Sequence, residues 1–268
     1  MPLRVPPQPR RVYANNPLKL VICQIRHPVN VRFDEPGFAV PAKDLLGDEY
    51  PRVTQERQVT FPFIIGGAGA ASAPSAQEAF WRFQDADATW SIAIARAFIT
   101  LETTRYRKYE EFESRLLRVL DVLDALGVTF RERLGVRYIN EIRHPDATSP
   151  TAWRKYLNPK VLGMIGGEEL GDDVIVAAQD IRLREPDGVF IIKHGYVGAD
   201  SSPDGVPTYQ IDLDLADEDP VKFDRNQTTK QIQGFHERIK NVFELSITDA
   251  LRDYLVVEEV LNDPGRET

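Results

Sequence analysis

Two long segments of the chain each carry one apolar stripe at helical spacing, and each follows several segments with the two-residue alternation of strands. In the second segment, residues 228–255, the stripe runs from Ile232 to Leu255 at intervals of three or four residues. A stripe of that length needs a broad apolar surface to cover it. The sequence therefore predicts an α+β fold, in which a twisted antiparallel sheet has two long helices packed on one face.

The order of predicted elements occurs twice. Residues 80–142 and residues 174–256 each contain a hairpin, a further strand and a long amphipathic helix. Sequence identity between the two segments is slight. Two interpretations follow, an internal duplication of a β-meander–helix unit or similar patterning without a common origin.

One α+β domain is predicted over residues 13–258. It is preceded by a flexible arm rich in Pro and Arg, residues 1–12, and followed by a disordered tail, residues 259–268. A Gly- and Ala-rich stretch, residues 66–75, reads as a surface loop because it lacks the Lys-Ser/Thr ending of a phosphate-binding loop. The arm and this loop are segments that can become ordered on a partner.

Charge and cysteine content exclude several classes of protein. The 268 residues include 33 Lys and Arg against 41 Asp and Glu, a net charge of −8, which disfavours nucleic acid as a partner. The single cysteine, Cys23, excludes an intramolecular disulfide and lies in an apolar run, where a small buried side chain is expected. No apolar run is long enough to span a membrane and no signal peptide is recognised, so we expect a cytoplasmic protein that does not bind membranes.

The acidic residues are unevenly placed. Residues 204–219 contain six Asp and Glu and no Lys or Arg, whereas residues 1–12 and 96–118 hold much of the opposing charge. Such segregation favours an oriented contact with a partner protein or with a second copy of the chain.

Asp212 and Asp214 form the strongest candidate for chemistry. Two residues apart on the polar side of a strand, their Cα atoms lie roughly 7 Å from each other. Such carboxylates can hold Mg²⁺ or divide acid and base roles. An ordinary solvent-facing surface is favoured, because no Glu or His lies at a suitable offset. His194 can complete a metal site with them, but its apolar strand favours a core or cross-strand histidine.

Gln24 and Arg26 are polar residues that end an otherwise apolar strand. If they are buried they need partners, which Asp212 or Asp214 can provide from a neighbouring strand. The pair indicates either the floor of a polar pocket or a structural salt bridge. Together with Arg96 it also defines where a small ligand or nucleotide would bind between the sheet and the helices.

Motifs for nucleophilic catalysis and dinucleotide binding are missing from the sequence. We therefore expect a non-enzymatic protein-binding or scaffolding protein, with no cofactor and no metal, that binds a partner protein or a second copy of itself. One alternative is a metal-dependent hydrolase or nuclease that uses Asp212 and Asp214. The other is a sensor of a small ligand or nucleotide.

Two segments resemble a sporadically distributed family of bacterial proteins of about this length. They are Asn16–Arg26 (N-P-L-x-x-V-x-x-Q-I-R) and the strand Tyr209–Asp214 (Y-x-I-D-x-D), and a helix containing His236 and Phe243 follows them as in the family. His27 stands where the family would have an aromatic residue. The family has no established biochemical activity, so the resemblance implies no catalytic residues. Its sporadic distribution implies an accessory role, such as one in a phage-defence or toxin-linked locus.

Overall fold

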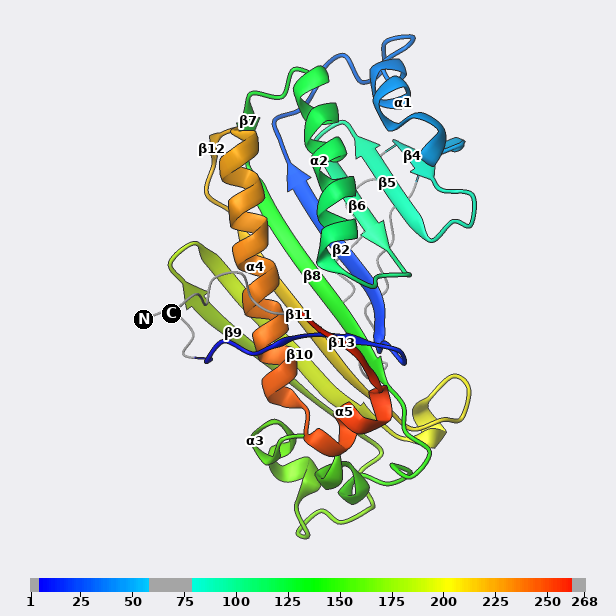
Figure 1. Cartoon of the computed structure of the whole chain (residues 1–268), viewed down its shortest axis with the longest axis vertical. Coiled ribbons are helices and arrows are strands. Elements are labelled where there is room, and N and C mark those ends of the chain that lie inside the picture. Colours follow the sequence, from blue (N-terminus) through cyan, green and yellow to red (C-terminus); the bar gives the residue numbers. More distant parts are fainter. Residues whose placement is uncertain (1–4, 58–78, 262–268) are drawn as a thin grey trace.

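The structure of the protein, a computed structural model, describes residues 5–57 and 79–261. Nine strands form one antiparallel sheet in the order β3-β4-β5-β6-β2-β8-β11-β10-β9 (Figure 1). The prediction of an α+β fold with an antiparallel sheet is confirmed. The strands are β1 (Arg10–Tyr13), β2 (Leu18–Arg26), β3 (Arg52–Glu56), β4 (Phe80–Gln84), β5 (Trp90–Ala95), β6 (Phe98–Thr103), β7 (Phe130–Arg131), β8 (Arg133–Ile142), β9 (Val176–Glu185), β10 (Gly188–Val197), β11 (Thr208–Asp217), β12 (Val221–Lys222) and β13 (Val257–Leu261), and the α-helices are α1 (Val40–Leu46), α2 (Tyr109–Ala125), α3 (Pro159–Leu162), α4 (Arg225–Ser246) and α5 (Asp249–Leu255).

The middle of the sheet is built from β2 and β8, which is why β2 is apolar on nearly both sides. Val21 of β2 lies opposite Tyr138 of β8, and Tyr138 lies opposite Leu213 of β11. Opposed residues of neighbouring antiparallel strands share one face of a sheet. This row continues through β10 to Ile181 at the edge strand β9.

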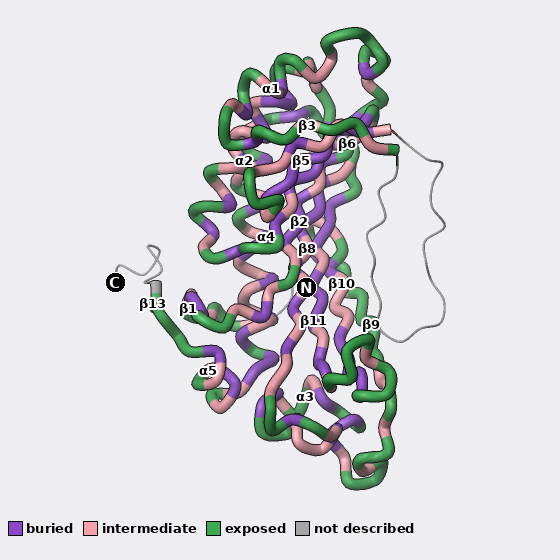
Figure 2. Tube along the Cα trace, turned by 90° about the vertical axis from the view of Figure 1, so that its right-hand side faces the viewer, coloured by how far each residue is buried: buried purple, intermediate pink, exposed green. Residues whose placement is uncertain are grey.

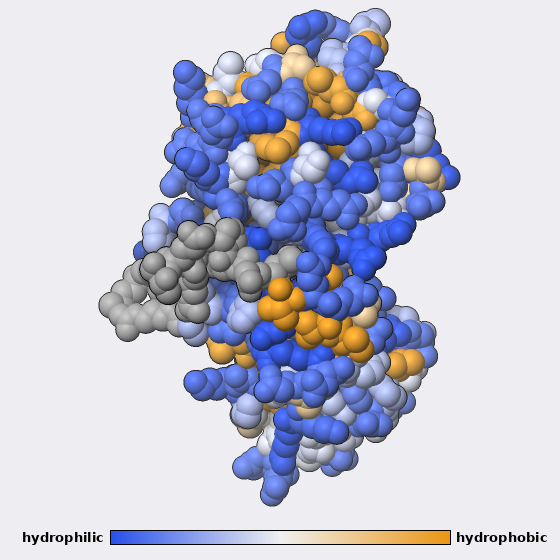
Figure 3. Space-filling view, in the orientation of Figure 1, coloured by the Kyte–Doolittle hydropathy of each residue, from blue (hydrophilic) through white to orange (hydrophobic). Residues whose placement is uncertain are grey.

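The long helix α4 packs on the face that carries this row, which we call the helix face. It contacts β8 and β11, and Phe235 and Ile239 are fully buried there. Figure 1 shows α4 in front of β8 and β11, and Figure 2 shows buried residues concentrated along the strands. In the orientation of Figure 1, Figure 3 shows a mostly hydrophilic surface with separate apolar patches. The opposite side, which we call the charged face, carries Asp212 and Asp214 among other charged residues. Within the two described ranges, every helix is too short or too polar to cross a bilayer.

The single helix predicted over residues 228–255 is two helices in the structure. α4 ends at Ser246, and Ile247 is extended and forms an isolated bridge with Leu157. The Thr248 hydroxyl then donates a hydrogen bond of 2.7 Å to the carbonyl of Lys155 before α5 begins. Backbone pairing with a neighbouring segment thus outweighs continuation of the helix at these polar residues.

Segments expected to be flexible are partly ordered. Residues Arg10–Val12 of the predicted arm belong to β1, which pairs antiparallel with β13. β13 includes residues 259–261 of the predicted tail. The expectation of a flexible arm over 1–12 and a disordered tail from 259 is therefore wrong for these residues, because each strand satisfies the backbone groups of the other. Residues 1–4, the 66–75 loop and residues 262–268 lie outside the described residues.

Candidate functional site

The charged face holds the two aspartates that the sequence singled out. Asp212 is 2% exposed and accepts two hydrogen bonds of 2.8 Å from the guanidinium of Arg137 on β8. Burial works against the charge on Arg137, but hydrogen bonds and attraction from Asp212 outweigh it and raise the pKa of Arg137. The expectation of an ordinary solvent-facing surface is wrong for Asp212, which is one half of a buried ion pair.

Asp214 and Gln24 meet the neighbouring arginine, Arg133. Its guanidinium lies 4.0 Å from the Asp214 carboxylate and donates a hydrogen bond of 3.2 Å to the Gln24 side chain. Gly135 makes room for it, since a Cβ there would lie 2.5 Å from an Arg133 nitrogen. Burial raises the pKa of Asp214, and the two nearby arginines oppose that shift. The predicted partnership of Arg26 with these aspartates is therefore wrong, because Arg133 and Arg137 of β8 pair with them instead.

Most of the acidic segment 204–219 is neutralised within the chain. Arginines of β8 and of the segments beside it pair with its carboxylates, so the segment is not a free acidic surface. The remaining pairs are Arg131 with Asp217 at 2.7 Å, Arg133 with Glu218 at 3.6 Å and Arg143 with Asp204.

The other predicted site residues lie elsewhere. His194 faces the helix side, opposite Ile211, and its Nδ1 lies 2.8 Å from the Tyr209 hydroxyl. The placement of His194 beside the aspartates is therefore wrong, and the prediction of a cross-strand histidine is confirmed. Arg26 is exposed at the end of β2, and Arg96, in the adjoining turn between β5 and β6, forms an exposed ion pair with Asp34. In the described ranges, no three His, Cys, Asp or Glu side chains are grouped to hold a metal ion.

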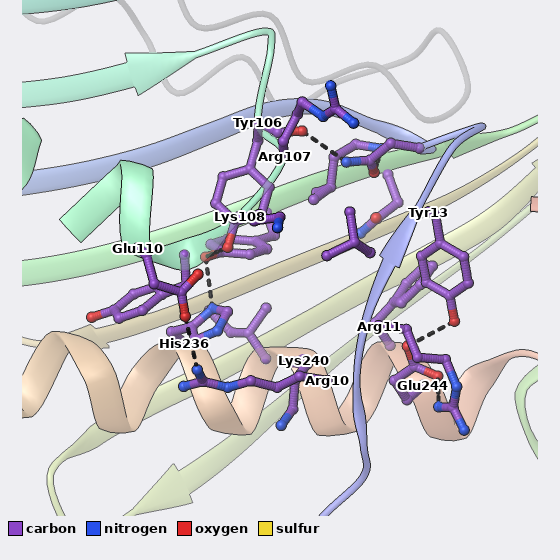
Figure 4. A pocket seen from close by; sticks show the side chains of 18 residues that line it. Arg10, Arg11, Tyr13, Tyr106, Arg107, Lys108, Glu110, His236, Lys240 and Glu244 are labelled. Carbon is purple, nitrogen blue, oxygen red and sulfur yellow. Dashed lines mark hydrogen bonds and ion pairs between the residues drawn. The ribbon is translucent and has the colours of Figure 1, made fainter. Parts of the chain in front are cut away.

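A cavity of about 80 Å³ lies on the helix face, between β1, the start of α2, α4 and the middle of the sheet (Figure 4). Aromatic rings and asparagines line its interior and charged side chains line its rim. The interior residues are Tyr13, Asn16, Tyr106, Tyr109, Tyr138, Asn140, His236 and Phe243, and the charged residues are Arg10, Arg11, Arg107, Lys108, Glu110, Lys240 and Glu244.

A chain of buried polar groups forms one wall of the cavity. The Tyr138 hydroxyl lies 2.8 Å from His236 Nδ1 and 3.4 Å from the Tyr106 hydroxyl. The Tyr109 ring stacks on the imidazole at 4.2 Å between ring centres. Burial lowers the pKa of His236 to about 3, although Glu237 opposes the shift. The imidazole is therefore neutral at physiological pH and presents a flat, uncharged surface.

The two-stranded ribbon β1–β13, which we call the strap, crosses α4 beside the cavity (Figure 1). Arg10 donates a hydrogen bond of 2.8 Å to Glu237 of α4. On the other strand, Glu258 pairs with Arg107 at 2.9 Å and Glu259 pairs with Lys108. Charge pairs thus hold both strands of the strap to the elements that surround the cavity.

Glu244 of α4 is the best-buried anchor of the strap. It is 2% exposed and accepts hydrogen bonds from the Tyr13 hydroxyl at 2.8 Å, Arg11 at 2.7 Å and Arg252 at 3.1 Å. We expect Glu244→Gln to detach β1, because a neutral amide cannot compensate two arginines. Backbone amides of β1 should exchange with deuterium at least tenfold faster than in the wild type. Glu110→Gln, which changes an exposed partner of Arg10, should leave their exchange within about twofold.

Comparison of the sequence with protein-family models and with curated proteins found no match to either. The geometry of the cavity and of the charged face therefore carries the functional inference.

The cavity residues were largely missed from the sequence. Tyr106, Tyr138 and His236 come from a loop, a central strand and a helix, and only His236 was named from the sequence, in the helix that resembles the bacterial family. One signal was present, since Tyr138 and His236 are polar side chains at positions that periodicity assigns to the core. A buried hydroxyl and a buried imidazole need partners, and here each is the partner of the other.

Proposed function

We propose that this chain is a non-enzymatic binding protein that holds a small ligand in the cavity beside the strap. The single observation that supports the proposal is the cavity itself. Sheet-and-helix cores are close-packed, and voids larger than a water molecule are few. The cavity of about 80 Å³ lies at the middle of the sheet, beside a segment held by charge pairs, and it combines an apolar lining with a few polar groups, as ligand sites do.

The interior of the cavity fits an apolar or aromatic body. The rings of Tyr106, Tyr138 and Phe243 supply apolar surface, and aromatic groups pack on such rings at centroid distances of about 4.5–7 Å. Asn16 and Asn140 add polar groups that can orient a ligand. His236 is neutral and contributes no charge to the interior.

The rim fits an anionic group. Five cations lie at the cavity, Arg10, Arg11, Arg107, Lys108 and Lys240, and each already pairs with a carboxylate of the chain. Arg107 and Lys108 are paired with strap carboxylates, so an anionic ligand would replace these carboxylates as their partner. The ligand class that follows is an aromatic or apolar molecule with one carboxylate or phosphate.

A thermal-shift screen tests the proposal. Aromatic carboxylates and nucleoside monophosphates, each with a neutral analogue of the same ring, are added to the full chain. We expect at least one anion to raise the melting temperature by about 2–4 °C while its neutral analogue does not, since ligands that bind only the folded state stabilise it.

Two charge-reversal variants make the screen specific to the cavity. Lys108→Glu removes a rim cation and should weaken binding of the anion at least tenfold by calorimetry. Lys160→Glu changes an exposed lysine of α3 away from the cavity and should leave affinity unchanged. Equal affinity of both variants, or no anion that stabilises the wild type, would refute the proposal.

Protein binding remains our proposal for the partner of this chain, and a separate observation, the edge of β9, supports it in the next subsection. The metal-dependent alternative is weakened, since Asp212 is already engaged by Arg137 and His194 lies on the other face.

We also infer that the chain is an internal duplication with both long helices on one face. Two features support this inference. β2 pairs with β6, the last strand of the meander that precedes α2, and β8 pairs with β11, the last strand of the meander that precedes α4. Phe112 of α2 packs against Trp90, at 6.1 Å between rings, and Trp90 lies in the same row as Tyr138. The second unit would then begin with β8 rather than at residue 174.

A further inference from the structure

The strand β9 forms one end of the sheet, so one of its two edges faces away from the other strands. It pairs with β10 over its whole length, and within residues 5–57 and 79–261 no strand pairs with its outer side. Residues 179–182 are exposed. At the corresponding place in the first half of the chain, the outer side of β4 is covered by β3. A long exposed edge is a template for pairing with another strand.

The hairpin geometry fixes which backbone groups point outward. The two-residue connection between Glu185 and Gly188 makes these two residues the hydrogen-bonded pair that closes the hairpin. Hydrogen-bonded pairs then alternate along the strand, so odd-numbered residues of β9 bond to β10. The N–H and C=O groups of Ala178, Asp180, Arg182 and Arg184 therefore point away from the sheet.

Charge selects one way for two copies of β9 to pair. In an antiparallel pair with twofold symmetry, a centre at Asp180 places two aspartates opposite each other, and a centre at Arg182 places two arginines opposite each other. A centre at Ile181 instead places Asp180 opposite Arg182 of the second copy, twice. It also brings together two Ile181 side chains, each 40% exposed, in a non-hydrogen-bonded pair, where side chains lie closest.

We propose that two copies of this chain pair edge to edge through β9, antiparallel, with the twofold axis at Ile181. The sheet becomes continuous across both copies. The row of the helix face that ends in Leu213, Ile192 and Ile181 continues into the same row of the second copy. Hydrogen bonds from the outward groups hold the contact, and Arg182, which lies 3.3 Å from Asp180 of its own chain, gains Asp180 of the second copy as a further partner.

Single cysteine variants of the full chain test both the contact and its register. Cys23 is buried and its pKa is raised to about 12 by burial, so it does not oxidise readily and any disulfide reports the new cysteine. Ile181→Cys should form a disulfide-linked dimer under mild oxidation, because non-hydrogen-bonded antiparallel positions are within disulfide reach.

Two neighbouring variants on the same face are the matched controls. In the proposed register Gln179 lies opposite Leu183 of the second copy, and two Gln179 side chains lie about 13 Å apart along the strand. Gln179→Cys and Leu183→Cys should each remain monomeric on non-reducing gels, whereas a mixture of the two should cross-link. No dimer from Ile181→Cys, or equal cross-linking by all three variants alone, would overturn the proposal.

A charge swap gives a second readout in solution. Asp180→Arg and Arg182→Asp each place like charges opposite one another, so each should reduce dimer formation at least tenfold in sedimentation velocity. The variant with both changes restores opposite charges and should recover the dimer. A wild-type chain that stays monomeric at every concentration measured, or a double variant no better than the singles, would contradict the proposed register.

Discussion

Replacing Arg137 with alanine is expected to lower the free energy of unfolding by about 3–5 kcal/mol, because it removes the cation that donates both hydrogen bonds to a buried carboxylate. Asp212 is 2% exposed, and its carboxylate accepts two hydrogen bonds of 2.8 Å from the Arg137 guanidinium. Urea unfolding of the wild type and of Arg137→Ala at pH 7 measures the difference.

Two further variants show that the loss comes from the unpaired charge. The double change Arg137→Met with Asp212→Leu removes both charges and should recover most of the stability, since a buried ion pair is often replaceable by apolar groups. Arg105→Ala breaks an ion pair with Asp87 in which both side chains are exposed, and should cost less than about 1 kcal/mol. If Arg137→Ala lowers the free energy of unfolding no more than Arg105→Ala does, the buried ion pair does not stabilise the fold more than an exposed one.

Acid is expected to weaken the fold through His236. Burial lowers its pKa from 6.5 to about 3 in the folded protein. Between these two pH values the unfolded chain binds a proton that the folded chain does not, so stability present above pH 6.5 is lost as the pH falls. At 1.36 kcal/mol per pKa unit, the loss between pH 6.5 and pH 4.5 is about 2–3 kcal/mol.

The variant His236→Gln isolates this contribution. Other groups titrate in the same range, including Asp214, whose raised pKa gives an effect of opposite sign. These groups are present in both proteins, so their effects cancel in the difference between wild type and variant. Urea unfolding at pH 7 and pH 4.5 should show a smaller loss for His236→Gln by about 2 kcal/mol. The same loss in both proteins would mean that His236 does not carry the acid sensitivity.

Local patterns predicted the strands well because alternation depends only on neighbouring residues. The placement of Asp212 and Asp214 on one face of the sheet, and of Tyr209 and Ile211 on the other, follows from the period of two and agrees with the structure, although Asp212 is buried on its face. The arginines that pair with Asp212 and Asp214 could not be predicted from this alternation. We expected Arg26, but the strand beside β11 is β8, and strand order in a sheet depends on long-range packing that local periodicity does not encode.

The cavity was harder to predict for the same reason. From the sequence, Tyr106 and Tyr138 look like ordinary core residues. Only the packing of α4 on the sheet brings His236 against the Tyr138 hydroxyl. The break after Ser246 could be predicted in kind, from polar residues inside a helical pattern, because side-chain competition with the helix backbone is local. The path of the chain after this break, through α5 and into β13, could be known only from the structure.

The pairing of β1 with β13 also sets an order of events during synthesis. Arg10 lies opposite Leu261, so β1 leaves the ribosome long before its partner strand is made. The sheet and α4 can assemble first, since their contacts need no residue beyond Leu255, while β1 contacts α4 but has no partner strand. The side of the cavity that β1 covers therefore closes last, after the slowest and most distant contact in the chain has formed. A ligand that binds the growing chain would therefore meet the cavity without the wall that β1 adds in the finished protein.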